Sequence, residues 1–228
     1  MSAAGATLAV VGAGGNVGSH LVPLLARLPA VGRLVLVDRG SYQAADLVTQ
    51  AITPRDVGRP KARVQARRAR RLRPQLAVEA LHADLAAVPP GRLRGAALLA
   101  CLDGRAARQR VNELARWLGM PWIDGGVRAD GLLARADLYG AGEESACLEC
   151  AWSEQDYAAL ETADPCGEGE PAPTGAPAAL GALAAALQAL LCGRLLAGEA
   201  PPALPEGGDG WRVVLAAGHG RAQATRLP

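Results

Sequence analysis

Short apolar runs alternate with glycine-rich and polar segments at the start of this chain. The run TLAVVG at 7–12 has the length and the β-branched content of a buried strand, and RLVLVD at 33–38 has the same character. Between them, the segment GAGGNVGS leads into HLVPLLARL at 20–28, whose apolar spacing predicts a helix. This order predicts a strand–helix–strand unit with a glycine-rich turn at the mouth of its helix.

Apolar runs and helical patterns keep alternating after this unit. A polar segment at 41–52 predicts a short helix, and the apolar spacing that follows predicts longer helices at 60–72 and 105–118. Apolar runs predict further strands at 75–80, 96–102, 121–126 and 132–139. Strands that alternate with helices are typical of an α/β fold with a doubly wound, mostly parallel, Rossmann-like sheet.

Beyond these strands the pattern changes. Residues 140–177 are rich in glycine, proline, acids and cysteine, and they predict a crossover loop. Residues 178–197 predict a long, alanine-rich apolar helix. Two short runs at 211–217 and 221–227 predict a final hairpin.

The glycine-rich turn indicates a bound nucleotide. Gly12 permits the tight turn, while Gly14 and Gly15 let the backbone approach a ligand, and the helix start presents N–H groups to a phosphate. Asp38 ends the second strand, where an acid accepts hydrogen bonds from a ribose. Val17 stands where the third glycine of G-x-G-x-x-G is expected. The turn alone therefore leaves three alternatives: a dinucleotide, as in an NAD(P)-dependent oxidoreductase, ATP, or a turn without a ligand.

Composition indicates one domain in solution. Half of the 228 residues are hydrophobic, and the net charge of +2 gives the chain no polyelectrolyte character. No basic segment precedes an apolar run at the N-terminus, and the most apolar stretch, 176–192, lacks the bulk of a membrane span. We expect a cytoplasmic protein without membrane association.

The chain is expected to form one domain with two regions. Residues 1–140 would form its nucleotide-binding, Rossmann-like region, and 141–228 would add the crossover loop, apolar helix and C-terminal strands of the same domain.

Several later segments occur in an order that favours one family. They are DVGRPKA at 56–62, CLDGRAARQRVNELA at 101–115, CLEC at 147–150, and Cys166 ahead of the long apolar helix. Over roughly residues 7–197 this set resembles the ThiF/MoeB/HesA family of ubiquitin-activating-type adenylyltransferases. The resemblance implies a homodimer that binds ATP and magnesium. It also implies adenylation of the C-terminal carboxylate of a ubiquitin-like protein, a sulfur-carrier protein or a peptide.

The resemblance also assigns roles to single residues. Lys61, the only lysine among 24 basic residues, would contact phosphate, where the alternative is a solvated surface lysine. Asp103 would hold the magnesium ion, where the alternative is a helix N-cap. Asp38 would bind the ribose. The remaining nucleotide-binding positions implied by the resemblance are Gly12, Gly14, Gly15, Asn16, Asp46 and Gln50.

Three positions depart from the family's pattern. The Asn that usually follows the metal-binding acid is Gly104 here. The family also usually carries an Asn followed three residues later by an Arg, and these positions are Asp46 and Thr49 here. A cation that would touch the triphosphate is thus missing, unless Arg39, Arg55 or an arginine of a partner subunit replaces it. The departure keeps a second interpretation open, a non-catalytic scaffold that binds a carrier protein or a peptide.

The cysteines allow two interpretations each. Cys147 and Cys150 form a C-x-x-C pair that is half of a structural zinc site, or else a plain thiol pair. Cys166 matches a cysteine that takes part in the family's thioester, persulfide or disulfide chemistry, or else is an ordinary exposed thiol. Cys101 and Cys192 lie in apolar segments and are expected to be packing residues.

A basic segment at 59–73 holds eight lysine or arginine residues among fifteen. Ala62, Ala66 and Ala69 form a stripe at helical spacing that would face the sheet, with the arginines on the solvent side. No aromatic residues interleave with the charges, so nucleic acid is not expected as a partner.

Overall fold

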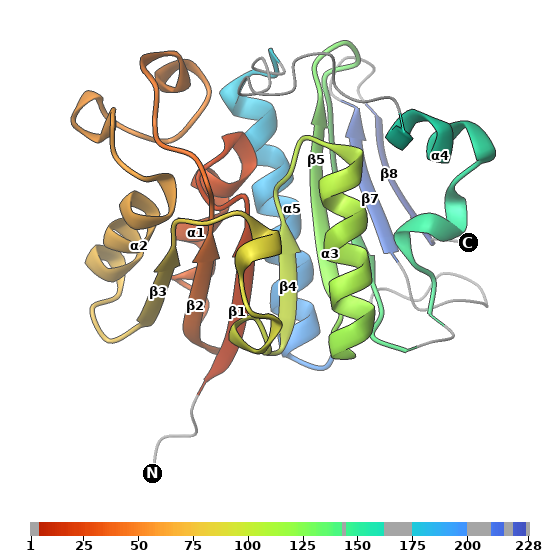
Figure 1. The fold of residues 1–228 in the computed structure, drawn as a ribbon, viewed down its shortest axis with the longest axis horizontal. Helices are drawn as coiled ribbons and strands as arrows, with labels where there is room; N and C mark the ends of the chain where they lie inside the picture. The colour runs from red at the N-terminus through yellow and green to blue at the C-terminus, as the bar shows by residue number, and fades with distance from the viewer. Residues whose placement is uncertain (1–4, 143–144, 162–174, 200–210, 217–220, 227–228) are drawn as a thin grey trace.

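A mixed sheet of eight strands forms the centre of the computed structural model, which describes residues 5–142, 145–161, 175–199, 211–216 and 221–226 (Figure 1). The strand order is β3-β2-β1-β4-β5-β6-β7-β8. The strands from β3 to β5 pair in parallel, and those from β5 to β8 pair antiparallel. The strands are β1 (Ala6–Val11), β2 (Val31–Val37), β3 (Ala77–Leu81), β4 (Ala97–Ala100), β5 (Trp122–Arg128), β6 (Leu133–Tyr139), β7 (Trp211–Ala216) and β8 (Arg221–Arg226).

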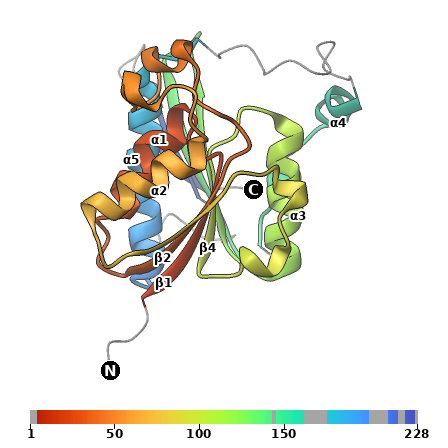
Figure 2. The same ribbon diagram turned by 60° about the vertical axis from the view of Figure 1, so that its left-hand side comes forward.

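Helices cover both faces of this sheet, as Figure 2 shows. One face packs against α1 (Asn16–Leu25), α2 (Lys61–Leu72) and α5 (Ala178–Leu196), and the other packs against α3 (Arg105–Leu118). Side chains of β1 alternate between the two layers, because successive residues of a strand point to opposite faces. The predicted Rossmann-like α/β class is therefore confirmed, including the final hairpin.

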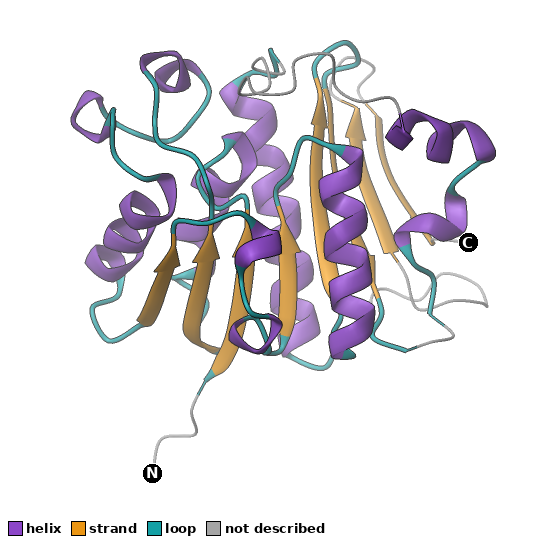
Figure 3. Cartoon of the chain, in the orientation of Figure 1, coloured by secondary structure: helices purple, strands orange, loops and turns teal. Residues whose placement is uncertain are grey.

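The structure differs from the sequence prediction in three segments. Helix α1 begins at Asn16, inside the glycine turn, rather than at residue 20. Residues 41–52 form only a short 3₁₀ turn at Ala44–Val48. The expected crossover loop contains a helix, α4 (Glu154–Glu161), drawn in purple in Figure 3; its Asp156 pairs with Arg105 at the start of α3. The 3₁₀ turn and α4 are too short for their apolar residues to form a periodic signal.

The basic helix α2 has the predicted orientation. Ala62, Ala66 and Ala69 are fully buried against the neighbouring elements. Small side chains on this stripe let the helix lie close to the sheet. The exposed positions of the same helix carry most of its arginines, for example Arg63 and Arg70.

Helix α5 is the one described helix that is long and apolar enough to cross a membrane. Here it is a core helix that packs on α1 and on β5 and β6. The Gln188 amide donates to the carbonyl oxygens of Ala100 and Ile123 at 2.9 and 3.0 Å, which ties the helix to the ends of two strands. Burial of a polar amide is tolerated because these hydrogen bonds satisfy it.

Gly181 sets the distance between α5 and α1. A Cβ atom at this position would overlap the Asn16 side chain, so we expect Gly181→Ala to lower the free energy of unfolding by about 2 kcal/mol. Thermal or urea unfolding would measure this. Gly193→Ala is the matched control on the same helix, since its Cβ would lie 3.9 Å from the nearest atom, Leu28 Cδ2. The control should gain up to about 1 kcal/mol from helix propensity; equal effects of both variants would contradict the packing argument.

Candidate functional site

The glycine turn between β1 and α1 is tightly built. Gly12 has a φ of +77°, in the left-handed region, and a Cβ there would overlap the carbonyl oxygen of Cys101. A Cβ on Gly14 would overlap the Lys61 stem and lie 2.9 Å from the Tyr42 hydroxyl oxygen. The space beside Gly14 is therefore filled by Lys61 and Tyr42. Only Gly15 leaves the expected space, with its nearest neighbour at 3.7 Å.

Helix α1 begins in the same glycine turn, and no side chain caps its N-terminus. The N-cap residue is Gly15, which has no side chain to satisfy the first-turn N–H groups, and no acid lies in that turn. Asn16 donates to the Ala176 carbonyl oxygen at 3.0 Å, and its Oδ1 is buried without a hydrogen-bond partner among the described residues. A helix end of this kind is suited to an anion such as phosphate.

Asp38 follows β2 and is fixed by the backbone on both sides. Its Oδ2 accepts from the Gly14 N–H at 2.8 Å, and its Oδ1 accepts from the Gly40 N–H at 2.9 Å. Burial raises the pKa of this carboxyl group, and the two N–H groups act in the opposite direction. A carboxylate offers about four lone-pair positions, so about two remain for ligand hydroxyls. The predicted ribose role fits this geometry.

Lys61 begins α2 and is held close to Asp38. Its N–H donates to the Gly40 carbonyl oxygen at 2.9 Å. Its Nζ lies 3.2 Å from Asp46 Oδ2, with both side chains only about 15% exposed, and 5.5 Å from the centre of the Tyr42 ring. The one lysine is therefore not a solvated surface residue, which was the alternative interpretation.

Asp46 is at the centre of a small polar cluster. Besides Lys61, it accepts hydrogen bonds from the Gln43 N–H at 2.8 Å and from the Gln50 amide at 2.5 Å. The Gln50 Oε1 is buried without a partner in the described part of the chain. Asp46 therefore links Lys61 to Gln50, and the nucleotide-binding roles of Asp46 and Gln50 stay predictions. The Asp46 carboxylate, however, neutralises the lysine.

Asp103 lies in the loop after β4. Its side chain is exposed and makes no hydrogen bond or ion pair with a described residue. Helix α3 is capped by Gly104 without a side-chain bond, so the N-cap interpretation of Asp103 is wrong. Both Asp103 and Asp38 add to the raised pKa of the Cys101 thiol, whose main cause is burial. The magnesium role of Asp103 therefore stays a prediction.

A buried ionic network lies behind this loop, and sequence reasoning missed it. The fully buried Asp124 accepts from Arg108 Nε at 3.0 Å and from Arg135 at 2.7 Å. Asp137, its neighbour across β5 and β6, pairs with Arg135 and with Arg212. The acids inside apolar strands could have indicated this network from the sequence, because a buried carboxylate needs a charged partner.

The cysteines and the substitute arginines lie in different surroundings. Cys101 and Cys192 are buried, which confirms their packing role. The Sγ atoms of Cys147 and Cys150 are 3.3 Å apart. No group of three or more metal-ligating side chains occurs among the described residues, so zinc at this pair needs other ligands and stays a prediction. Cys166 lies outside the described residues.

Neither arginine that we considered as a substitute for the missing cation is placed at the glycine turn by its contacts. Arg39 pairs with Asp84 at 3.1 Å. Arg55 lines a separate pocket with other arginines.

The fold and the rim of the sheet define the class of protein. A Rossmann-like sheet with a glycine turn, an uncapped helix start and an acid after the second strand is the arrangement found in nucleotide-binding α/β proteins. The sequence profile of the ThiF family matches residues 3–207, and the chain therefore belongs to the ThiF family.

Two curated relatives are similar over part of the chain. Ubiquitin-like modifier-activating enzyme 5 of Bombyx mori is 28% identical over 158 residues, and the protein of the same name from Oryza sativa subsp. japonica is 29% identical over 160 residues. Each match covers 64% of this chain, and 39% and 37% of the respective relative. The chain thus spans less than two fifths of the length of these relatives.

Solved structures share the fold. E. coli MccB with ATP superposes with a TM-score of 0.74 at 20% identity, over 97% of this chain and 63% of MccB. PaaA superposes with a TM-score of 0.71 at 16% identity, over 96% of this chain and 63% of PaaA. At these identities the likeness shows the fold alone.

Proposed function

We propose that this chain binds ATP at the rim formed by the glycine turn, Asp38 and Lys61, and adenylates the C-terminal carboxylate of a ubiquitin-like protein, a sulfur-carrier protein or a peptide. The observation that carries the proposal is the Asp38 carboxylate, which two backbone N–H groups hold beside the uncapped start of α1 and beside Lys61. The names of the relatives and the ATP-bound MccB structure support the same function. As in the family, the working unit would be a homodimer.

The reaction needs positioned charges more than covalent help from the protein. A carboxylate oxygen attacks the α-phosphorus, the bond to the bridging oxygen breaks, and pyrophosphate leaves. Lys61 would stabilise the phosphate charge, and the exposed Asp103 would supply a carboxylate ligand for magnesium, which usually binds one or two carboxylates and substrate phosphates. Bound magnesium would supply further neutralisation of the phosphates.

Pyrophosphate exchange tests the proposal. Radiolabelled pyrophosphate should enter ATP in the presence of magnesium and a carrier protein or peptide with a free C-terminus. Calorimetry should show ATP binding, and fluorescence titration with NADH should show none. Tight NADH binding without ATP binding would instead support an oxidoreductase.

A scaffold is the second candidate function, and the Lys61–Asp46 ion pair favours it. At 3.2 Å this pair neutralises the phosphate-contacting lysine, while the neighbouring family arginine is replaced by Thr49. ATP binding with no pyrophosphate exchange for any carrier would support the scaffold.

The ribose role of Asp38 gives a direct prediction. Asp38→Asn should weaken ATP binding about 10-fold, because it removes a charged hydrogen-bond acceptor and turns an NH₂ group toward a backbone N–H. The native affinity should also fall as the pH drops, since burial raises the pKa of Asp38 and the carboxylate takes up a proton above the usual range. Calorimetry across pH measures both effects. Asp130→Asn, on an acid that is 75% exposed, is the control and should leave the affinity unchanged.

A further inference from the structure

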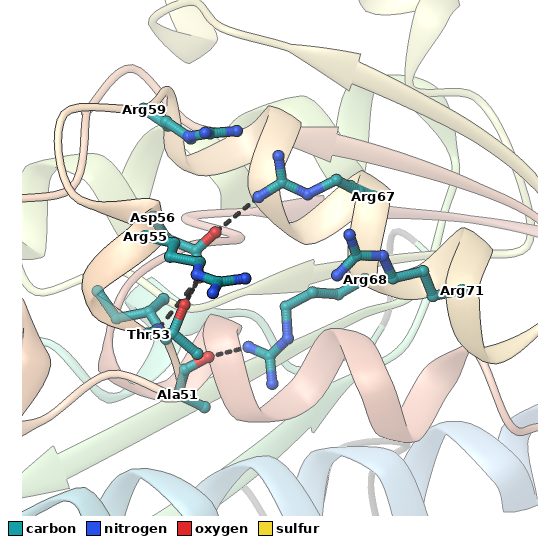
Figure 4. Close-up of a pocket in the computed structure, with 9 residues that line it drawn as sticks. Ala51, Thr53, Arg55, Asp56, Arg59, Arg67, Arg68 and Arg71 are labelled. Atoms are coloured by element: carbon teal, nitrogen blue, oxygen red, sulfur yellow. Dashed lines mark hydrogen bonds and ion pairs between the residues drawn. The ribbon is translucent and has the colours of Figure 1, made fainter.

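A strongly basic pocket lies between α2 and the loop before it. Its volume is about 410 Å³, and Figure 4 shows side chains from the loop and from α2 around one space. The charged residues that line it are Arg55, Asp56, Arg59, Arg67, Arg68 and Arg71. Five guanidinium groups thus share a concave surface with a single carboxylate.

The charges of this arginine pocket are not balanced by the protein. The carboxylate of Asp56 accepts from Thr53 and pairs with Arg67 at 2.6 Å. Arg68 donates to the Ala51 carbonyl oxygen, which leaves its charge unpaired. The other three arginines form no ion pair with any residue that the structure describes. Like charges gathered in this way repel one another, so an anion in the pocket would stabilise it.

One donor of the pocket is both buried and unused. The Nε atom of Arg67 has no hydrogen-bond partner in the described ranges, although solvent does not reach it. A buried donor without a partner is costly. This observation is independent of the charge count.

From these features we propose that the arginine pocket binds a small anion that carries several phosphoryl groups. Guanidinium forks match phosphate oxygens in geometry and charge. The volume is in the range of small-molecule sites, about 300–1,000 Å³, and the concave shape suits a compact anion better than an extended polymer. Neither Lys61 nor Asp38 lines this pocket, so it is distinct from the proposed ATP site.

Calorimetry with inorganic tripolyphosphate, in the absence of magnesium, tests the proposal. The triple variant Arg55→Gln/Arg59→Gln/Arg71→Gln should bind tripolyphosphate at least about 10-fold more weakly, because it removes three charged contacts. All three side chains are exposed and their charges repel one another, so the melting temperature of the variant should be at least that of the native chain. The matched control, Arg63→Gln/Arg94→Gln/Arg110→Gln, removes three exposed arginines outside the pocket and should bind like the native chain.

Two further arms identify the site and the ligand class. Lys61→Gln should leave a tripolyphosphate site in place, whereas loss of all binding in this variant would assign the anion to the ATP site and overturn the proposal. Equal weakening by the pocket and control triple variants would reduce the effect to net charge and also overturn it. Tighter binding of a single-stranded RNA or of an acidic peptide by the same arginines would replace the small anion by that macromolecule.

Discussion

Replacing Lys61 with glutamine is expected to lower the rate of pyrophosphate exchange by about 100-fold or more, in line with the loss of one preorganised charge at a reacting phosphate. Lys61 is the only lysine, and its backbone N–H is bonded to Gly40, two residues after Asp38. Its side chain is 15% exposed, so solvent screens its charge only weakly. Loss of this charge would leave the described glycine turn and the α1 start as the main phosphate contacts.

The Lys61→Gln variant also leaves Asp46 without its partner, so a folding defect has to be separated from a catalytic one. Thermal unfolding measures the first, and exchange at saturating ATP measures the second. Arg63→Gln on the same helix is the control, because Arg63 is exposed and outside both sites. An exchange rate unchanged in Lys61→Gln would remove Lys61 from the proposed mechanism.

Much of the fold could be predicted because its signals are local. Apart from Thr7 and Arg33 near their starts, the runs that became β1 and β2 are mainly apolar, since both faces of these strands are covered by helices. Helix α3 was predicted at its observed bounds, Arg105–Leu118, because its apolar positions recur at helical spacing and Gly119 ends it in the left-handed conformation. Helix α4 was not predicted, because its eight residues have no apolar face.

A site residue could be predicted only where its role follows from its place in a local sequence motif. Asp38 was found because an acid after the second strand has a fixed place beside the glycine turn. The position of Tyr42, fully buried beneath Lys61 and bonded by the Gln65 amide at 2.7 Å, had no local signal. The same is true of Gly14, whose missing side chain makes room for a lysine that lies far along the sequence. Such contacts depend on how distant segments meet.

The Lys61–Asp46 ion pair connects the departures from the family's pattern at positions 46 and 49. An asparagine at position 46 would leave the lysine free, and an arginine at 49 would add a second cation. In this chain an aspartate accompanies the loss of the arginine, so the charge available to a triphosphate falls twice. Variants at positions 46 and 49 together therefore distinguish an active adenylyltransferase from a scaffold more clearly than any single substitution.

Asp46→Asn is accordingly expected to tighten ATP binding by about 30-fold. For an assumed separation of about 8 Å between the carboxylate and a unit of phosphate charge, the repulsion is about 2 kcal/mol at an effective dielectric constant of about 20, which corresponds to this factor. Asparagine keeps an oxygen that can accept the Gln43 N–H, so the local turn should persist. Calorimetry with ATP and magnesium measures the change. Asp130→Asn, in the exposed turn between β5 and β6, is the control.

The double variant Asp46→Asn/Thr49→Arg tests catalysis as well as ATP binding. It restores the family's residue pair, and we expect pyrophosphate exchange to rise at least about 10-fold above the native rate, because a second cation then reaches the phosphates. Tighter ATP binding without any exchange would mean that the remaining machinery, including Asp103, is not arranged for chemistry, and the scaffold would be the better function. Unchanged ATP affinity in both variants would show instead that Asp46 orients Lys61 and does not compete with the nucleotide for it.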